Sequence, residues 1–208
     1  MNFETFRNSF LKQLCFTSGQ VYAAYPEFDK NNLWRWVKKG YLIKLRQGYY
    51  LFNESAGLPD VTFYVANCIY KPSYISLQTA LSYYGLIPET VVGMTSVSTL
   101  KTASFKNSLA EFTYKKINER LFSGYEMILF DGNKTIAMAT PEKALLDFFY
   151  LYPVYRSERD LLELRLNEDV LEESFDFDKM DTFISLFKNK RLENTVGLLK
   201  KVYGFKQL

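Results

Sequence analysis

The order of secondary-structure signals in the first fifty residues constrains the fold more than any other feature of this sequence. Asp29 is placed to cap a helix and Gly40 to end it, and two β-rich runs then flank Arg46-Gln47-Gly48, as in a hairpin. The predicted elements are a helix marked by Phe3, Phe6, Phe10 and Leu14, helices over 18–24 and 30–39, and strands over 41–45 and 49–52. Three helices followed by a hairpin predict a winged helix-turn-helix.

A linker is expected to separate this unit from a longer region of mixed character. Gly57 and Pro59 are typical of a linker, and a bridging helix is predicted over 61–70. Beyond it, the patterns predict helices over 76–84 and 140–151 and strands over 92–100, 111–118, 125–130 and 135–139. After residue 153 they predict one helix capped by Ser157, a second capped by Asp178, and a last helix marked by Leu192, Val196, Leu199 and Tyr203. We therefore expect an α+β chain, with a winged helix-turn-helix domain at 1–55 and a mixed α/β domain with a helical C-terminal part at 70–208.

Composition removes several functional classes. The chain of 208 residues has no histidine, which excludes Ser-His-Asp and Cys-His nucleophile systems and the zinc-protease helix. Its two cysteines, Cys15 and Cys68, are too few for a cysteine-only zinc site, and their apolar surroundings favour a reduced, cytoplasmic state. We expect no catalytic residues, no metal and no cofactor. No apolar run is long enough to cross a bilayer, so no membrane association is expected.

The net charge of +3 hides a strongly uneven distribution. Residues 28–50 carry six basic groups and one acidic group, whereas residues 158–181 carry ten acidic and three basic groups. Residues 188–206 again hold six basic groups and one acidic group. The C-terminal basic stretch could complement the acidic one within the chain or add an electrostatic contact to DNA, and the sequence leaves both open.

The basic concentration in 28–50 predicts contact with double-stranded DNA. A recognition helix lies in the major groove, where Asn pairs with adenine and Arg with guanine, while Lys side chains bind phosphates. In the hairpin, polar residues at the wing tip would approach the adjacent backbone or minor groove. The candidate DNA-binding residues are Lys30, Asn31, Asn32, Arg35, Lys38, Lys39, Lys44, Arg46 and Gln47. The alternative is an ordinary solvated basic face.

Trp34 lies off the apolar stripe of the third helix, which Leu33, Trp36 and Val37 form. A tryptophan in this place most often packs against the first helix or a wing strand. Contact with a base or a sugar is the alternative.

Four residues raise the hypothesis of a nuclease: Asp131, Glu142, Lys143 and Asp147. They approach the metal-dependent pattern of an acid followed by Glu-x-Lys, but Glu142 and Lys143 are adjacent. Neighbouring side chains on a helix diverge by about 100°. We therefore expect Glu142 to be a helix-start acid that favours the positive end of the dipole.

Four segments of the chain together resemble a known family. They are 33–50 (LWRWVKKGYLIKLRQGYY), 74–89 (YISLQTALSYYGLIPE), 112–114 (FTY) with 121–125 (LFSGY), and 139–147 (ATPEKALLD). Across about residues 18–152 the chain resembles the AbiEi antitoxins of type IV toxin–antitoxin (abortive infection) systems, in the form with an N-terminal winged helix-turn-helix. Residues 153–208 match least well.

The resemblance implies a non-enzymatic transcriptional regulator. Members of that family bind an inverted-repeat operator upstream of their own operon and repress it, and their second domain opposes a cognate nucleotidyltransferase-like toxin. By position, the DNA role would fall to Lys30, Asn31, Asn32, Arg35, Lys38, Lys39, Lys44 and Arg46. The alternative function is a winged-helix regulator that senses a small ligand through its aromatic second domain.

Overall fold

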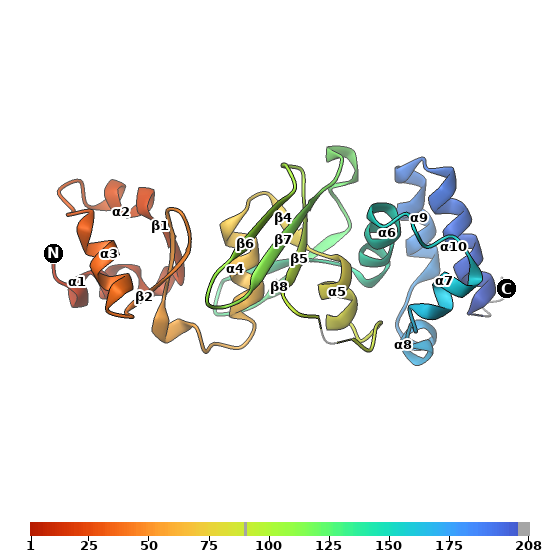
Figure 1. Ribbon diagram of the computed structural model, residues 1–208, viewed down its shortest axis with the longest axis horizontal. Helices are drawn as coiled ribbons and strands as arrows, with labels where there is room; N and C mark the ends of the chain where they lie inside the picture. Colours follow the sequence, from red (N-terminus) through yellow and green to blue (C-terminus); the bar gives the residue numbers. More distant parts are fainter. Residues whose placement is uncertain (90, 204–208) are drawn as a thin grey trace.

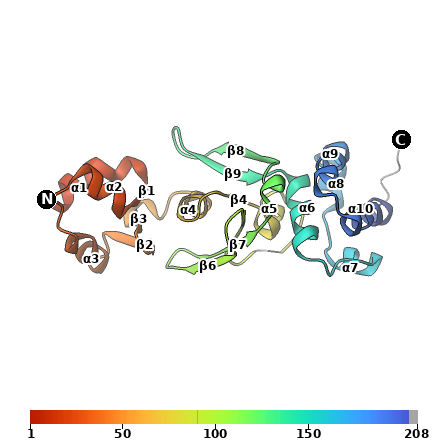
Figure 2. The same ribbon diagram turned by 90° about the horizontal axis from the view of Figure 1, so that it is seen from above.

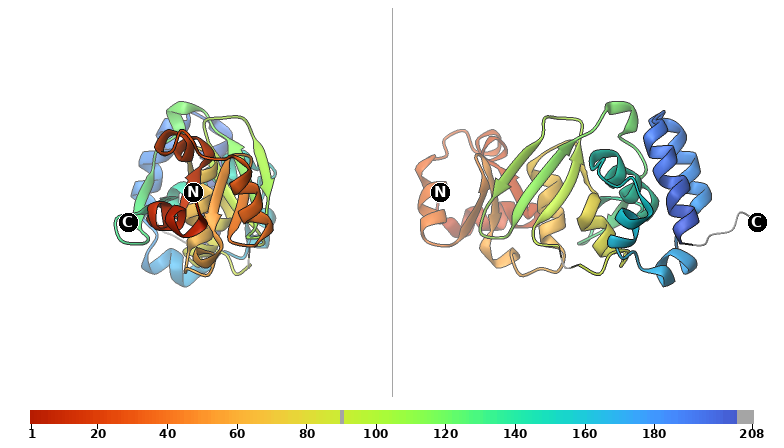
Figure 3. Two further views of the ribbon diagram at one scale, coloured as in Figure 1. Left: turned by 90° about the vertical axis from the view of Figure 1, so that its left-hand side faces the viewer. Right: turned by 45° about the vertical axis from the view of Figure 1, so that its right-hand side comes forward.

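The protein has an α+β fold, as predicted, and its parts follow one another along a long axis (Figure 1). The computed structural model describes residues 1–89 and 91–203; residues 204–208, the end of the predicted second domain, lie outside the described part. A winged-helix unit (residues 3–55) lies at one end, a sheet unit (residues 61–151) in the middle, and the C-terminal helices (residues 158–202) at the other end (Figure 3).

The winged-helix unit has the predicted order of helices and hairpin, with one strand added. Its elements are α1 (Phe3–Phe10), η1 (Leu11–Gln13), β1 (Cys15–Thr17), α2 (Ser18–Ala24), α3 (Asn31–Lys38), β2 (Leu42–Arg46), β3 (Tyr49–Phe52) and η2 (Asn53–Ser55). Of Thr17 and Ser18, the two residues that the sequence offers as the cap of α2, Thr17 is the cap, in a capping box with Gln20. Asp29 lies one residue too early to cap α3 and instead accepts a hydrogen bond from the Asn31 amide at 2.9 Å.

The three strands form an antiparallel sheet in the order β1-β3-β2, and both of its faces are covered. Because side chains alternate along a strand, Leu42 and Phe52 face the helices of the same unit, where they join a cluster with Phe6 and Trp36. Leu45 and Leu51 face the sheet unit and belong to its core together with Leu14. The hairpin is therefore held between two hydrophobic clusters.

The sheet unit is built on a mixed six-stranded sheet in the order β6-β7-β5-β4-β9-β8. Strands β4–β9 and β5–β7 pair in parallel, and the remaining neighbours pair antiparallel. The elements are α4 (Val61–Ile69), β4 (Ser73–Ile75), α5 (Leu77–Tyr83), β5 (Met94–Ser98), β6 (Ala103–Lys106), β7 (Glu111–Lys116), η3 (Glu119–Leu121), β8 (Tyr125–Leu129), β9 (Thr135–Ala139) and α6 (Pro141–Leu151). The predicted helices and four predicted strands are present, whereas β4 and β6 were missed.

Helices cover this sheet on both faces (Figure 2). α4 lies on the face toward the winged-helix unit, where the Asn67 side chain bonds the backbone of Ala137 in β9 through both its amide atoms. α5 and α6 lie on the opposite face and pack against each other. α6 begins as predicted, with Thr140 as its cap and Pro141 in its first turn.

The C-terminal helices are α7 (Glu158–Glu163), α8 (Glu168–Glu173), α9 (Phe177–Phe187) and α10 (Lys190–Val202). Ser157 caps α7 as predicted. The cap predicted at Asp178 is wrong: α9 begins earlier, and Asp176 accepts the Lys179 amide at 2.9 Å. α8 was not predicted.

The acidic and basic C-terminal stretches complement each other in part. Lys200 pairs with Asp181 at 2.6 Å, and Lys201 pairs with Glu158 at 2.7 Å. Lys206, also counted in the basic stretch, lies outside the described residues. The intramolecular alternative therefore accounts for two of these lysines.

Candidate nucleic-acid interface

Helix α3 buries one side and presents the other to solvent. Leu33 and Trp36 insert into the aromatic cluster of the winged-helix unit, where the Trp36 ring lies 4.7 Å from that of Phe6 and 5.7 Å from that of Phe28. This packing fixes the rotation of the helix about its axis, because only the apolar stripe fits the cluster. The polar side chains of α3 must therefore point away from this cluster, and α3 itself lies in the unit at one end of the molecule (Figure 1).

Most of the predicted DNA-binding residues share this outward surface. Lys44 and Leu42 are two residues apart on β2 and so share one face of the strand, which is the face toward the helices of this unit. The exposed members of the predicted set are Lys30, Asn31, Arg35, Lys38, Lys39, Lys44 and Gln47, and Asn32 is half-buried. We call these eight residues the α3 face.

Arg46 is not part of the α3 face. Its guanidinium carbon lies 4.6 Å from the ring centre of Tyr49, 4.9 Å from that of Phe105 in β6 and 5.8 Å from that of Tyr70. Its Nε is buried and has no hydrogen-bond partner among the described residues. The pairing of β2 with β3 shifts register between Lys44 and Arg46, so alternation does not place their side chains on the same face. Arg46 thus packs between the two units, and the structure does not bring it to the proposed DNA surface.

Arg35 is already engaged on the α3 face. It donates a hydrogen bond to Asn32 Oδ1 at 2.9 Å, and it lies 3.3 Å from Asp29 Oδ2. Both ion-pair partners are about half exposed, so the pair is weak and can exchange for a stronger bidentate ligand. Asp29 is the one acidic residue of the 28–50 segment, and it lowers the positive potential of the surface.

Trp34 also differs from its predicted position. The expectation that it packs inside the unit is wrong, because 60% of its surface is exposed. Lys38 covers part of the ring, with its ammonium nitrogen 4.2 Å from the ring centre. Large exposed aromatic side chains are typical of binding surfaces, so Trp34 extends the α3 face.

The hairpin is fixed by hydrogen bonds both to the sheet unit and to α2 of its own unit. Asn107 donates a hydrogen bond to the Leu45 carbonyl at 3.0 Å, and the Gly48 carbonyl in the turn accepts the Ser18 amide at 2.9 Å. The turn therefore does not extend freely from the domain, and Lys44 and Gln47 are its exposed polar residues from the predicted set.

Charged residues of α6 have the opposite environment. Lys143 and Asp147 are buried, 1% and 0% exposed, and form an ion pair along one side of the helix. The Asp147 carboxylate also accepts hydrogen bonds from Tyr74 Oη at 2.8 Å and Ser76 Oγ at 2.9 Å, and Lys143 donates to Tyr74 Oη at 2.8 Å. Burial lowers the pKa of Lys143 and raises the pKa of Asp147, while their mutual attraction opposes both shifts.

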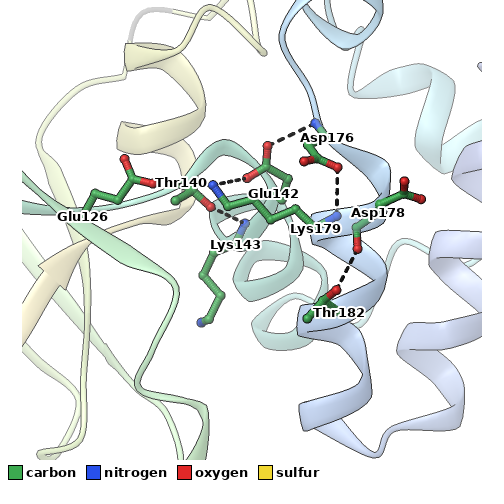
Figure 4. A network of polar contacts seen from close by, with 8 residues as sticks. All are labelled: Glu126, Thr140, Glu142, Lys143, Asp176, Asp178, Lys179 and Thr182. Carbon is green, nitrogen blue, oxygen red and sulfur yellow. Dashed lines mark hydrogen bonds and ion pairs between the residues drawn. The ribbon is translucent and has the colours of Figure 1, made fainter.

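Glu142 diverges from Lys143, as the helix geometry predicts (Figure 4). It accepts the Asp176 amide at 3.2 Å and lies 3.6 Å from the Lys179 ammonium, so it joins α6 to α9. Asp131 is exposed in the β8–β9 turn and pairs with Lys134. Across residues 1–89 and 91–203, no three acidic or cysteine side chains are grouped so as to hold a metal ion. The four residues of the nuclease hypothesis are thus divided among separate structural roles.

A cavity of about 540 Å³ opens between the sheet and the helices α5, α6 and α7. Its lining mixes aromatic and charged side chains, including Tyr152, Tyr155, Lys115 and Glu163. This volume is in the range of small-molecule sites. It is the feature of the sheet unit that favours the ligand-sensing alternative.

In the part of the chain that the structure covers, every helix is too short or too polar to cross a membrane. Comparison with protein-family models gave no match, and comparison with curated proteins gave none.

Proposed function

We propose that this protein is a DNA-binding transcriptional repressor that also acts as the antitoxin of a type IV toxin–antitoxin system. The observation that carries the DNA-binding part is the α3 face: four cationic side chains and an asparagine lie exposed on or beside one helix whose other side is locked into a core. A helix presented in this way, followed by a hairpin, suits the major groove.

Each side chain of the α3 face has a proposed role set by its chemistry. Asn31, in the first turn, reads a base edge, and Arg35 exchanges Asp29 for the two acceptors of a guanine. Lys38 and Lys39, at the C-terminal end, neutralise phosphates, and Lys44 does so from the hairpin. Arg46 is left out of the proposal, because its guanidinium is enclosed by aromatic rings at the junction.

The operator is proposed to be an inverted repeat upstream of the protein's own operon. Such a site offers two equivalent half-sites and is served by two copies of the chain. The proposal places the protein in the cytoplasm, where the DNA is and where free thiols stay reduced.

The test of the DNA-binding part is a gel-shift titration with the upstream repeat. Arg35→Ala combined with Asn31→Ala should abolish the shift, since both base contacts are lost. The matched control is Arg159→Ala combined with Asn133→Ala, which removes the same side-chain types from exposed positions elsewhere. If the α3 double variant shifts the repeat as well as the control does, the helix assignment is wrong.

The antitoxin part rests on the family resemblance of the four segments, of which 74–89 and 139–147 build β4, α5 and α6. The proposed partner is a nucleotidyltransferase-like toxin encoded next to this gene. Its presence there, and relief of its toxicity by co-expression of this chain, would support the proposal. A neighbouring toxin whose growth arrest is unchanged by this chain would refute the antitoxin part while leaving the DNA part intact.

The second candidate function is a ligand-sensing winged-helix regulator, which the 540 Å³ cavity favours. A small molecule bound there should raise the thermal midpoint of the protein and change its affinity for the repeat. Replacement of a lining residue, Tyr155→Ala, should remove both effects. A stabilising ligand whose effect survives this change would bind elsewhere.

The proposal includes no catalysis. Plasmid cleavage in the presence of Mg²⁺ that is lost in Glu142→Ala would contradict it.

A further inference from the structure

The two cysteines meet at the junction between the winged-helix unit and the sheet unit. Cys15 begins β1, and Cys68 lies in the last turn of α4, 53 positions later in the sequence. Each thiol shifts the pKa of the other, so the two side chains are neighbours. Both are free and partly exposed, and both line an open cavity of about 500 Å³ that also contains Tyr64, Lys71 and Lys134. A small oxidant in solvent can therefore reach them.

The surroundings favour one thiolate and one thiol. The hydrogen bond from Cys15, the charge of Lys71 and the hydroxyl of Tyr64 lower the pKa of Cys68, and they outweigh its burial. The negative end of the α4 dipole, at its C-terminus, disfavours a thiolate at Cys68. The Lys71 ammonium favours it, and Lys71 lines the same cavity as Cys68. The hydrogen bond to Cys68 and burial raise the pKa of Cys15. Cys68 is thus the better nucleophile, and Cys15 is held beside it as a neutral partner.

We propose that Cys15 and Cys68 form a reversible, peroxide-sensitive disulfide that joins the winged-helix unit covalently to α4. The inference is independent of DNA binding and of the toxin, since no residue of the α3 face takes part.

The reaction needs hydrogen peroxide as its oxidant and proceeds in two steps. The Cys68 thiolate attacks one peroxide oxygen, the O–O bond breaks, and the sulfur becomes a sulfenic acid while hydroxide leaves. The Cys15 sulfur then attacks the Cys68 sulfur, the S–O bond breaks, and the departing hydroxide takes the Cys15 proton as water. Peroxide gains two electrons, and the two sulfurs together lose two. A cellular dithiol reverses the change by exchange.

The disulfide would fix the winged-helix unit and the sheet unit in position relative to each other. β1 pairs with β3, and β3 pairs with β2, so a bond at Cys15 connects the whole hairpin sheet to the face of the six-stranded sheet. The closed loop spans residues 15–68 and contains α3. Because a cross-link of this length restricts the unfolded chain, the oxidised protein should unfold at a higher urea concentration.

The experiment treats the full-length protein with equimolar hydrogen peroxide and counts free thiols after denaturation. We expect the count to fall from two to none per chain, with a monomeric band on a non-reducing gel, and to return to two with dithiothreitol. A peptide map should show one link, between the peptides that carry Cys15 and Cys68. Two thiols remaining after treatment, or a disulfide-linked dimer, would overturn the proposal.

Single variants test the two roles. Cys15→Ser should accumulate a sulfenic acid on Cys68 that dimedone traps, whereas Cys68→Ser should react with peroxide at least tenfold more slowly. Tyr64→Phe removes one donor to Cys68 and keeps the ring, so oxidation should slow severalfold and reach the same disulfide. Equal rates in the two serine variants would refute the assignment of Cys68 as the attacking sulfur. Even if a variant fails to fold, the peptide map of the wild-type protein shows whether the disulfide forms.

Discussion

Helices α3 and α6 carry similar numbers of charged side chains but place them in opposite environments. On α3, Arg35 and Lys38 lie in solvent and the apolar residues lock the helix to its core. On α6, Lys143 and Asp147 lie inside, and their side-chain hydrogen bonds join them to each other and to Tyr74 and Ser76 of the same unit. A charge in solvent stays available to a ligand, whereas a buried pair is committed to the fold. Substitutions of the charged residues on α3 should therefore change binding, and those of Lys143 and Asp147 on α6 should change stability.

The largest expected effect is on the buried pair. Asp147→Ala leaves the Lys143 ammonium without a counter-ion and two hydroxyls without an acceptor, so we expect a loss of about 5 kcal/mol in the free energy of unfolding, at the upper end of values for broken buried pairs. Urea denaturation followed by circular dichroism measures it. The double variant Lys143→Met/Asp147→Leu, which removes both charges, should recover much of this loss. A loss below about 1 kcal/mol in the single variant would show that Lys143 finds another partner.

The two tryptophans of α3 allow the same comparison, between a buried and an exposed side chain, within one helix. Trp36 is 6% exposed in the aromatic cluster, so Trp36→Ala should cost about 3–5 kcal/mol in the free energy of unfolding. Trp34→Ala removes a side chain that is mostly in solvent, and its effect on the same quantity should stay within about 0.5 kcal/mol. The same pair of variants tests binding, because Trp34→Ala should weaken the complex with the upstream repeat. Equal destabilisation by the two changes would mean that Trp34 packs in solution.

These contrasts also show what the sequence reveals and what it does not. The amphipathic stripe of α3, the helix over 18–24 and the start of α6 are local signals, and each prediction is confirmed. The strands β1, β4 and β6 have only three or four residues, too few for an alternating pattern, and pairing with distant strands makes them extended. Sequence could not predict them, because the information lies in the tertiary contacts.

The features of the candidate sites divide in the same way, into those set by local sequence and those set by tertiary contacts. The helical part of the α3 face was predictable because helix periodicity alone decides which residues of α3 point outward. Arg46 was not, because its surroundings come from Phe105 and Tyr70, far away in the chain. The ion pair of Lys143 and Asp147 did leave a signal, since residues four apart on a helix are neighbours. The approach of Cys15 to Cys68 left none, because it depends on how the two units pack.

A smaller effect is expected for a single phosphate contact. Lys38→Gln should leave stability unchanged and reduce by about 1 the slope of log affinity against log salt, since one fewer counterion is released. The measurement is a salt titration of binding to the upstream repeat. Lys190→Gln is the matched control, because Lys190 is 84% exposed on α10, away from α3. If both variants reduce the slope equally, the positive charge acts through the total charge of the protein and not through the α3 face.

The smallest effect concerns a charge pair that is neither buried nor on the α3 face. Arg7 on α1 and Glu54 in η2 form a bidentate pair with both N–O distances at 2.6 Å, and the hydrogen bonds from Arg7 lower the pKa of Glu54. Because the folded pKa lies below the unfolded value of about 4.3, the pair stabilises the folded state above that pH and loses its effect as the pH falls through the folded pKa. Glu54→Gln should therefore lower the urea midpoint slightly at pH 7 and low salt, and solvent screening keeps the difference far below that of Asp147→Ala. At pH 2, or in 1 M salt, wild type and variant should unfold together. A difference that persists at pH 2 would show that Glu54 contributes through packing and not through its charge. Exposed and buried charged residues would then have to be distinguished by their packing contacts and not by their ionisation.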